Sequence, residues 1–439
     1  MTSTIARIAR SQLIAARNAV RGWPLVYTGT TGMTLDADDL ELADALLADR
    51  RDWASDAPVA AFEREFAAWN GSSSAFAFAS GRIALSAAVD ALGLRAGDHV
   101  VMPGYSCVVV ATALRNAGIQ PIFADIELET YGLDKDALQR SITPQTRAIL
   151  VHHLYGFVSR DLDAILEIAR ARGLAVIEDC AQAAGAQHGG RHVGNFGDVA
   201  IFSGDASKPF TCIQGGIAVA NDERLSARLG TIRTAAATHG DPAIEQRLRN
   251  VALIYAMNKD PQRWWKAELI WARHGRDYFF GIPAAELAGA SPLDAGYRMS
   301  GPIARLAANQ LRKLDHYNAR RRANAGRWEA WCDAEGFAKP LTVRGSIPSV
   351  LRYPVLVKPE MKRDLRWAFR SLGVVPGQWF ETHLHPSPEV IDGVPNATRA
   401  VAECLNFPTL YFEDRWEAAA RDESSTGARS TVPDPRSGS

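Results

Sequence analysis

The chain has 439 residues, enough for two folding units or for one large unit with a satellite. The charges of its 49 basic and 49 acidic residues cancel, so the chain has no net positive charge that would attract nucleic acid or an acidic membrane. The five cysteines are far apart and lack CxxC spacing, which argues against a disulfide framework or a zinc site. We therefore expect a cytoplasmic protein that recognises a small molecule and has no nucleic-acid partner.

No apolar run reaches the roughly 20 residues that span a bilayer, so we predict no integral membrane segment. Residues 1–23 are rich in arginine, lack acids and repeat apolar residues at near-helical spacing. This pattern favours an amphipathic helix packed on its own protein over a membrane-surface helix or a transit peptide. We assign residues 1–58 to an N-terminal helical segment. The polar residues 417–439 are typical of a disordered tail.

From residue 59 onward, strand-like and helical segments alternate. Short apolar runs predict strands at residues 73–79, 99–103, 119–126, 147–154, 174–179 and 199–203. Apolar residues at helical spacing predict helices at residues 61–69, 81–94, 106–118, 134–140 and 161–173. Such alternation requires crossover connections and gives a mainly parallel sheet covered on both faces. Residues 59–234 are therefore predicted to be the large three-layer domain of an α/β protein.

The second half of the chain is less regular. Residues 235–293 contain helical patches without a clean period, and we interpret them as an insertion or connecting segment. A long one-sided helix is predicted at residues 303–322 and another helix at residues 362–372, with extended segments around the latter. These features predict a connecting helix and a smaller C-terminal α+β domain over residues 294–416.

Several polar residues follow or end predicted strands. They are Ser80 to Arg82, Tyr105, Asp179 and Ser203. Because ligands of α/β sheets bind outside the carboxyl ends of the strands, we expect these residues to lie close together.

The turn Ser80-Gly81-Arg82 lies between a predicted strand and a predicted helix. The free backbone N–H groups and the positive end of the helix can bind one anion there, and glycine lets the backbone approach closely. Phosphate is one candidate. The alternative is an ordinary helix cap.

Asp179 closes the apolar run LAVI, and a buried carboxylate needs a partner. A protonated pyridine nitrogen would be such a partner, and the carboxylate would keep the ring able to accept electrons. The alternative is a helix N-cap.

Lys208 has small neighbours, including Gly204, Ala206 and Pro209, which leave room for a ring. A partly desolvated lysine can attack a carbonyl and form a Schiff base, whereas an ordinary lysine is exposed. A phosphate turn, a carboxylate and a lysine are the parts that a pyridoxal 5'-phosphate enzyme needs.

The chain also resembles a known family. The motifs FASGRIAL, GDHVVMPGYSCVVVATA, VIEDCAQAAGA, VGNFGDVAIFS and GGIAVAND, all between residues 59 and 229, are similar to those of the DegT/DnrJ/EryC1/StrS sugar aminotransferases. GYRMSGPIARLAANQLRKLD and THLHP resemble the connecting helix and small domain of that family more loosely. The resemblance implies the fold type I architecture of pyridoxal phosphate-dependent transferases and a homodimer.

The resemblance also assigns roles to residues that contact the ring. It makes Lys208 the imine-forming lysine and general acid–base, and Asp179 the partner of the pyridine nitrogen. Gln182 would contact the ring hydroxyl, and Tyr105 would stack on the face of the ring.

At the phosphate, the resemblance implies Ser80 and Ser203 together with the backbone of Gly81 and Arg82. Arg82 is a departure, because many relatives have threonine there. Its guanidinium could add a charge toward the phosphate or the substrate.

Two other positions depart from the family pattern. Gly296 stands where relatives often carry an asparagine that reaches the phosphate of the neighbouring subunit, and Gln214 replaces a glutamate. The cross-subunit phosphate contact is therefore left open.

The resemblance implies transfer of an amino group from glutamate or glutamine to a keto-sugar, nucleotide-linked, in polysaccharide or secondary-metabolite amino-sugar biosynthesis. One alternative is a sugar dehydratase of the same fold, but such relatives carry histidine in place of Lys208. The other is a catalytically silent sugar-nucleotide binding or regulatory protein.

His152 and His153 are adjacent in a strand and point to opposite faces, so we predict no metal site. His383 and His385 are expected to line the substrate entrance or to pack. The tryptophans at 264 and 265 are expected in a core or an interface.

Overall fold

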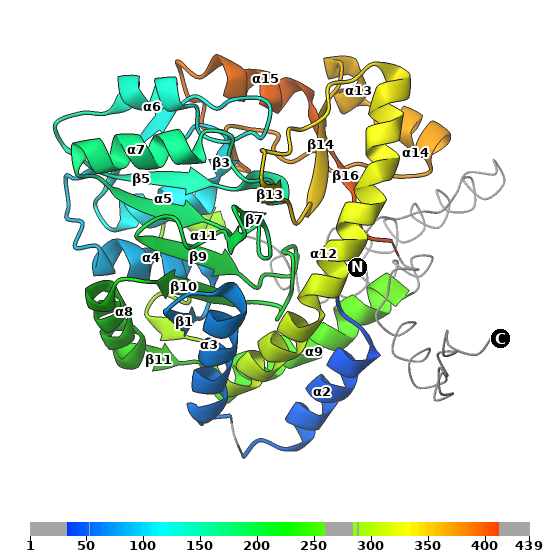
Figure 1. Cartoon of the computed structure of the whole chain (residues 1–439). Coiled ribbons are helices and arrows are strands. Elements are labelled where there is room, and N and C mark those ends of the chain that lie inside the picture. The colour runs from blue at the N-terminus through cyan, green and yellow to red at the C-terminus, as the bar shows by residue number, and fades with distance from the viewer. Residues whose placement is uncertain (1–32, 52, 260–283, 288, 412–439) are drawn as a thin grey trace, which may run out of the picture.

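The computed structural model describes residues 33–51, 53–259, 284–287 and 289–411. The predicted arginine-rich helix, the tryptophans at 264 and 265 and the predicted C-terminal tail lie outside these residues. A nine-stranded sheet with the order β11-β12-β1-β10-β9-β6-β5-β2-β4 forms the centre of the molecule (Figure 1).

Five neighbouring strands of this sheet are parallel, as the alternation of strands and helices predicted. They are β9 (Val199–Ser203), β6 (Ala175–Asp179), β5 (Thr146–His152), β2 (His99–Pro103) and β4 (Gln120–Ala124). β10 (Gly216–Ala220) runs antiparallel to β9, and β1 (Ser74–Phe78) runs antiparallel to β10. β1 is therefore parallel to β9, and its carboxyl end lies at the same edge of the sheet. The short strands β11 (Ala237–Thr238) and β12 (Tyr297–Arg298) complete it.

Helices cover both faces of the sheet. One layer consists of α4 (Gly81–Ala91), α5 (Val108–Asn116) and α8 (Glu223–Ala235). The other consists of α3 (Ala57–Asn70), α6 (Lys135–Ser141), α7 (Leu162–Arg172) and the first half of α12 (Gly301–Glu335). Along β5, Ile149 and Val151 pack into one layer and Ala148 and Leu150 into the other. The predicted three-layer α/β architecture is confirmed.

The C-terminal part packs apolar side chains such as Val355 and Phe407 into one core with Tyr105 and Tyr155 of the large domain. β14 (Arg352–Leu356) pairs with β16 (Cys404–Pro408), and the helices beside them are α13 (Pro359–Arg363), α14 (Arg366–Leu372) and α15 (Pro395–Glu403). The single helix predicted at residues 362–372 is two helices, separated at Asp364, whose carboxylate accepts a hydrogen bond of 3.1 Å from the Arg366 N–H. Such a side-chain bond competes with helical pairing. β15 (Leu384–His385) pairs with β3 (Ser106–Cys107) in a separate two-stranded sheet, which joins this part to the segment that follows β2.

The described part of the predicted insertion contains the long helix α9 (Asp241–Lys259) and the short α11 (Ala284–Leu287). α9 packs against α2 (Ala37–Ala48) and α12 (Figure 1). The insertion therefore adds a wall to the domain instead of forming a separate unit in its described part.

A buried charge cluster joins α2 to α12. Lys313 lies 2.8 Å from Asp38 and 2.5 Å from Asp39, and the Tyr317 hydroxyl donates a hydrogen bond to Asp36. Burial raises the pKa of Asp36 to about 6, although the nearby Lys313 and Tyr317 act in the opposite direction.

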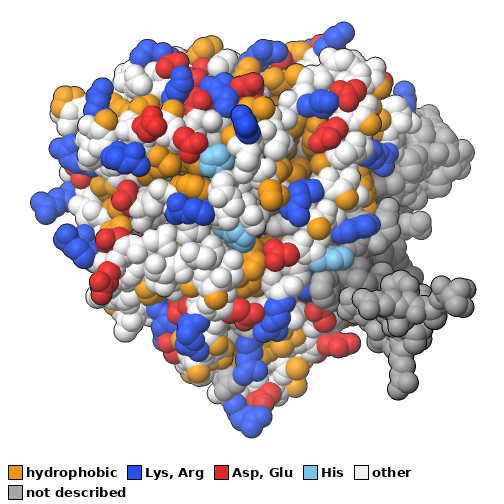
Figure 2. Space-filling model, viewed as in Figure 1, with side chains coloured by type: hydrophobic (Ala, Val, Ile, Leu, Met, Phe, Trp, Pro, Cys, Tyr) orange, Lys and Arg blue, Asp and Glu red, His pale blue; other side chains and the backbone are white. Residues whose placement is uncertain are grey.

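On the surface shown in Figure 2, basic and acidic side chains are interspersed, in keeping with the equal numbers of the two in the sequence. None of the described helices is both long enough and apolar enough to cross a membrane.

Candidate active site

A cavity of about 910 Å³ opens at the carboxyl ends of the parallel strands. His152 and Asp179 end the neighbouring strands β5 and β6 and are paired with each other. Ser203 ends β9 and pairs with Gly216, which pairs with Phe78 on its other side. The sheet therefore aligns the ends of these strands in one row. The predicted site residues that line the cavity are Ser80, Gly81, Arg82, Asp179, Gln182, Ser203 and Lys208.

The turn before α4 has the features of a phosphate site. Ser80 is the N-cap residue, yet its hydroxyl makes no cap hydrogen bond and has no hydrogen-bond partner among the described residues, although it is buried. The first N–H groups of the helix lack intrahelical acceptors. A Cβ on Gly81 would lie 3.1 Å from the Ser203 Cβ, and one on Gly216 would lie 2.1 Å from the Ser80 carbonyl oxygen. The glycines thus permit a close-packed cradle with an unused hydroxyl, which fits a phosphate.

Asp179 is positioned by its own turn. One carboxylate oxygen accepts a hydrogen bond of 3.0 Å from the Ala181 N–H, and the half-buried side chain lines the cavity. No helix follows in residues 180–186, so the alternative reading as a helix N-cap is wrong. The carboxylate is available to a cationic ring nitrogen in the cavity.

Lys208 lies in the loop after β9, where its N–H donates to the Asp205 carbonyl oxygen at 3.0 Å. Its side chain is half-buried, and the described structure shows no ion pair at its Nζ. Lys208 and Asp179 both lie close enough to the thiol of Cys107 to influence its pKa. Burial raises this pKa most, Lys208 lowers it, and Asp179 and Asp205 raise it. The lysine and the carboxylate thus face one cavity, as a shared ring requires.

Gln182 and His152 line the same wall. The Gln182 carbonyl oxygen accepts a hydrogen bond of 3.0 Å from the Tyr155 N–H, which leaves its amide nitrogen for a ligand. The His152 Nε2 lies 2.7 Å from the Tyr131 carbonyl oxygen, and burial lowers the pKa of this histidine. A neutral imidazole that donates from Nε2 fits both observations.

Tyr105 lies elsewhere than the expected stacking position. It is fully buried, its hydroxyl is 3.1 Å from the Tyr155 hydroxyl and accepts a hydrogen bond of 2.8 Å from the Phe380 N–H, and it does not line the cavity. Cys107, two residues further along, lines the cavity instead. The tyrosine packs in the core that the C-terminal part shares with the large domain, and the C-terminal part supplies the Phe380 N–H to its hydroxyl.

The guanidinium of Arg82 points to acidic residues. It lies 2.8 Å from the Glu286 carboxylate and 3.6 Å from that of Asp294, both of which are buried. Burial raises the pKa of Glu286, Arg82 lowers it and Asp294 raises it. The charge of Arg82 is thus offset within the protein, and its backbone N–H remains the contribution to the cradle.

Two functional features were not found from the sequence. One face of α9, with Gln246, Arg247 and Asn250, lines the cavity. Glu178, next to Asp179, is fully buried and accepts hydrogen bonds from Gly194, Phe196 and Gly197 as well as His153. No motif marks either feature, because both depend on contacts between distant parts of the chain.

The C-terminal part closes one side of the cavity with Trp379, Phe380, His385 and Pro386. The two histidines that were expected to line the substrate entrance or to pack behave differently. His385 lines the cavity, whereas His383 packs with its Nε2 2.9 Å from the Thr398 hydroxyl.

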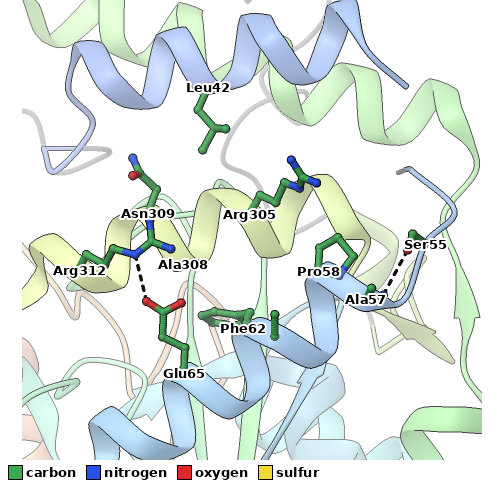
Figure 3. A pocket seen from close by; sticks show the side chains of 11 residues that line it. Leu42, Ser55, Ala57, Pro58, Phe62, Glu65, Arg305, Ala308, Asn309 and Arg312 are labelled. Atoms are coloured by element: carbon green, nitrogen blue, oxygen red, sulfur yellow. Dashed lines mark hydrogen bonds and ion pairs between the residues drawn. The ribbon is translucent and has the colours of Figure 1, made fainter. Parts of the chain in front are cut away.

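A second cavity, of about 530 Å³, lies between α2, α3 and α12 (Figure 3). Leu42 and Phe62 form apolar walls, and Arg312 pairs with Glu65 at 3.1 Å across one side. None of the predicted site residues lines it. The larger cavity is therefore the candidate active site.

Comparison with known proteins identifies the family of the chain. The sequence profile of the DegT/DnrJ/EryC1/StrS aminotransferase family matches residues 35–412. The chain is 36% identical over 293 residues to the L-glutamine:2-deoxy-scyllo-inosose aminotransferase of Streptomyces kanamyceticus, covering 64% of this chain and 67% of that protein. It is 39% identical over 167 residues to the GDP-perosamine synthase of Escherichia coli O157:H7, covering 38% of this chain and 46% of that protein.

The chain spans less than half the length of several of the curated relatives that it matches. The 42% identity to the L-glutamine:2-deoxy-scyllo-inosose aminotransferase of Streptoalloteichus tenebrarius covers only 42% of this chain and 43% of that protein.

Solved structures share the fold. DesV of S. venezuelae, in complex with a ketimine intermediate, has a TM-score of 0.66 at 24% identity over 89% of this chain and 93% of that one. NtdA of Bacillus subtilis, with bound cofactor PMP, has a TM-score of 0.65 at 22% identity over 89% of this chain and 82% of that one. The predicted fold and family are confirmed: the chain belongs to the DegT/DnrJ/EryC1/StrS aminotransferase family, whose members are fold type I pyridoxal phosphate enzymes.

Proposed function

We propose that the chain is a pyridoxal phosphate-dependent aminotransferase that moves an amino group from glutamine or glutamate to a keto-sugar. The observation that carries the proposal is that Lys208, Asp179 and the Ser80-Gly81 cradle line one cavity of about 910 Å³. The relatives named above, which act on inososes or make GDP-perosamine, support a polyhydroxylated ketone as acceptor. A nucleotide-linked acceptor, a role in amino-sugar biosynthesis, a homodimer and a cytoplasmic location belong to the same proposal.

When bound, pyridoxal phosphate supplies an electron sink for the carbon that loses its proton. Ser80, Ser203 and the backbone at Gly81 and Arg82 would hold its phosphate. Asp179 would keep the ring nitrogen protonated, because a buried carboxylate stabilises a neighbouring cation.

Lys208 would hold the cofactor covalently, and its freed Nζ would take a proton from the donor carbon and return one to the cofactor carbon. Gln182 would orient the ring through its amide nitrogen, and the side chains of Trp379 and Phe380 would keep water from that side of the cavity.

Absorbance spectroscopy of the purified full chain tests this proposal. The protein should bind pyridoxal phosphate and turn yellow, and L-glutamine or L-glutamate should bleach the visible band. Lys208→Arg should bind the cofactor without responding to either donor. Colour that no amino acid bleaches would favour a silent binding protein, and a protein that binds no cofactor would refute the assignment.

A further inference from the structure

α9 brings a cation into the active-site cavity from the predicted insertion. Ala243, Gln246, Arg247 and Asn250 line the cavity at the spacing of one helix face. Arg247 is the residue of this face that carries a charge, and it lies near the middle of the helix.

Neutral acceptors hold the Arg247 guanidinium. Its Nε donates to the Gln214 side-chain Oε1 at 3.0 Å, its Nη1 donates to the Ala243 backbone carbonyl oxygen at 3.2 Å, and its Nη2 lies 3.1 Å from the His239 Nε2. Within the part of the chain that the structure describes, no carboxylate forms an ion pair with it. The two terminal nitrogens each keep a further N–H group for a ligand.

The contacts of Arg247 lead to the phosphate cradle. The Gln214 amide nitrogen donates to Asp294 at 3.0 Å, and Asp294 lies 3.6 Å from the guanidinium of Arg82, whose backbone N–H belongs to the cradle. Gln214 also precedes Gly215 and Gly216, and Gly216 packs against the Ser80 carbonyl group. The arginine is therefore connected to the cradle from two sides.

The charges in the cavity distinguish Arg247 from Arg82. Glu286 and Asp294 form ion pairs with Arg82, whereas no described carboxylate forms an ion pair with Arg247. Burial lowers the pKa of Arg247, while Asp294 and Cys212 raise it, so the cation lacks full compensation until an anion binds.

We propose that Arg247 of α9 binds the 5'-phosphate of the cofactor and supplies, from the same chain, the cationic contact that the cradle lacks. This inference rests on the proposed function, since it concerns the same cavity. A planar guanidinium with spare N–H groups suits a phosphate, which it can contact through two parallel hydrogen bonds.

Titration of the cofactor-free full chain with pyridoxal phosphate and with pyridoxal, which lacks the phosphate, tests the proposal. Arg247→Gln should raise the Kd for pyridoxal phosphate roughly 10- to 100-fold, the loss expected for one charge-assisted contact, and leave the Kd for pyridoxal within about twofold. Arg247→Lys should keep part of the affinity. Arg249→Gln, on the exposed face of the same helix, is the matched control and should match the wild type.

Three outcomes would overturn the inference. An unchanged Kd for pyridoxal phosphate in Arg247→Gln would exclude the phosphate contact. If the Kd is unchanged but the KM for glutamine rises, the arginine binds the carboxylate of the amino donor instead. An equal rise in the Kd for pyridoxal phosphate and for pyridoxal would indicate that Arg247 has a structural role. Circular dichroism of the variant and the affinities of Arg247→Lys would check that role. Failure of the wild type to bind pyridoxal phosphate would refute the proposed function itself.

Discussion

Glu178 offers a direct test of how the active-site wall is held in place. One of its carboxylate oxygens accepts hydrogen bonds of 2.7 Å from both Phe196 and Gly197. The other accepts bonds of 2.9 Å from Gly194 and 3.1 Å from the His153 Nε2. Burial alone would raise the pKa of Glu178, but these donors outweigh burial and lower it.

Glu178→Gln keeps the shape and removes the charge. The His153 Nδ1 accepts a hydrogen bond of 3.2 Å from the Ser159 N–H, so the proton of this histidine lies on Nε2 and faces Glu178. Whichever way the glutamine amide turns, two N–H donors then face its NH₂ group. At about 1–3 kcal/mol for each donor left without an acceptor, the variant should lose about 2–6 kcal/mol of unfolding free energy.

Urea unfolding at pH 7 measures this loss, and Glu167→Gln on the exposed face of α7 is the control, which should change stability by less than about 0.5 kcal/mol. Because the folded pKa of Glu178 is lowered, its stabilisation is present above the unfolded pKa near 4.5 and disappears as the pH falls through the folded value. The gap between wild type and variant should therefore narrow in acid. A loss below about 1 kcal/mol at pH 7, or a gap that stays constant in acid, would refute the reasoning.

Three further substitutions address other parts of the structure. Because the pKa of Asp36 is raised from 3.8 to about 6, the contribution of this residue to stability should fall by about 3 kcal/mol as the pH rises through this range. The wild type should therefore lose about that much unfolding free energy relative to Asp36→Asn, and parallel urea-unfolding profiles for the two proteins would contradict the prediction. Tyr105→Phe should cost about 1–3 kcal/mol, because the Phe380 N–H loses its acceptor, and should leave the cofactor spectrum unchanged; a tenfold weaker cofactor affinity would instead place Tyr105 at the ring. Gly216→Ala should abolish cofactor binding in absorbance titrations, because its Cβ would lie 2.1 Å from the Ser80 oxygen, and normal binding would show that this backbone can shift.

Much of the fold could be predicted because buried parallel strands are short apolar runs with polar residues at their ends. The strand predicted at residues 99–103 is β2, and the one at residues 199–203 is β9. The rule that ligands bind at the carboxyl ends of such strands then placed Asp179 and Ser203 at one cavity.

The remaining features depend on contacts that sequence spacing does not reveal. Tyr105 comes shortly after β2, but its hydroxyl accepts a hydrogen bond from the Phe380 N–H of the C-terminal part, and the residue packs in the core there and not in the cavity. Glu178 has no motif because its partners lie in a distant loop. Arg247 lies in a segment without a clean period, and only the packing of α9 brings it to the cavity.

The central claim is that Lys208 holds a pyridoxal phosphate molecule in this cavity. Reduction of the cofactor-loaded protein with borohydride, followed by proteolysis and mass spectrometry, tests it most directly. The account predicts that the reduced cofactor is attached to the peptide containing Lys208 and that Lys208→Ala yields no such peptide. A cofactor fixed to another lysine, or to none, would contradict it.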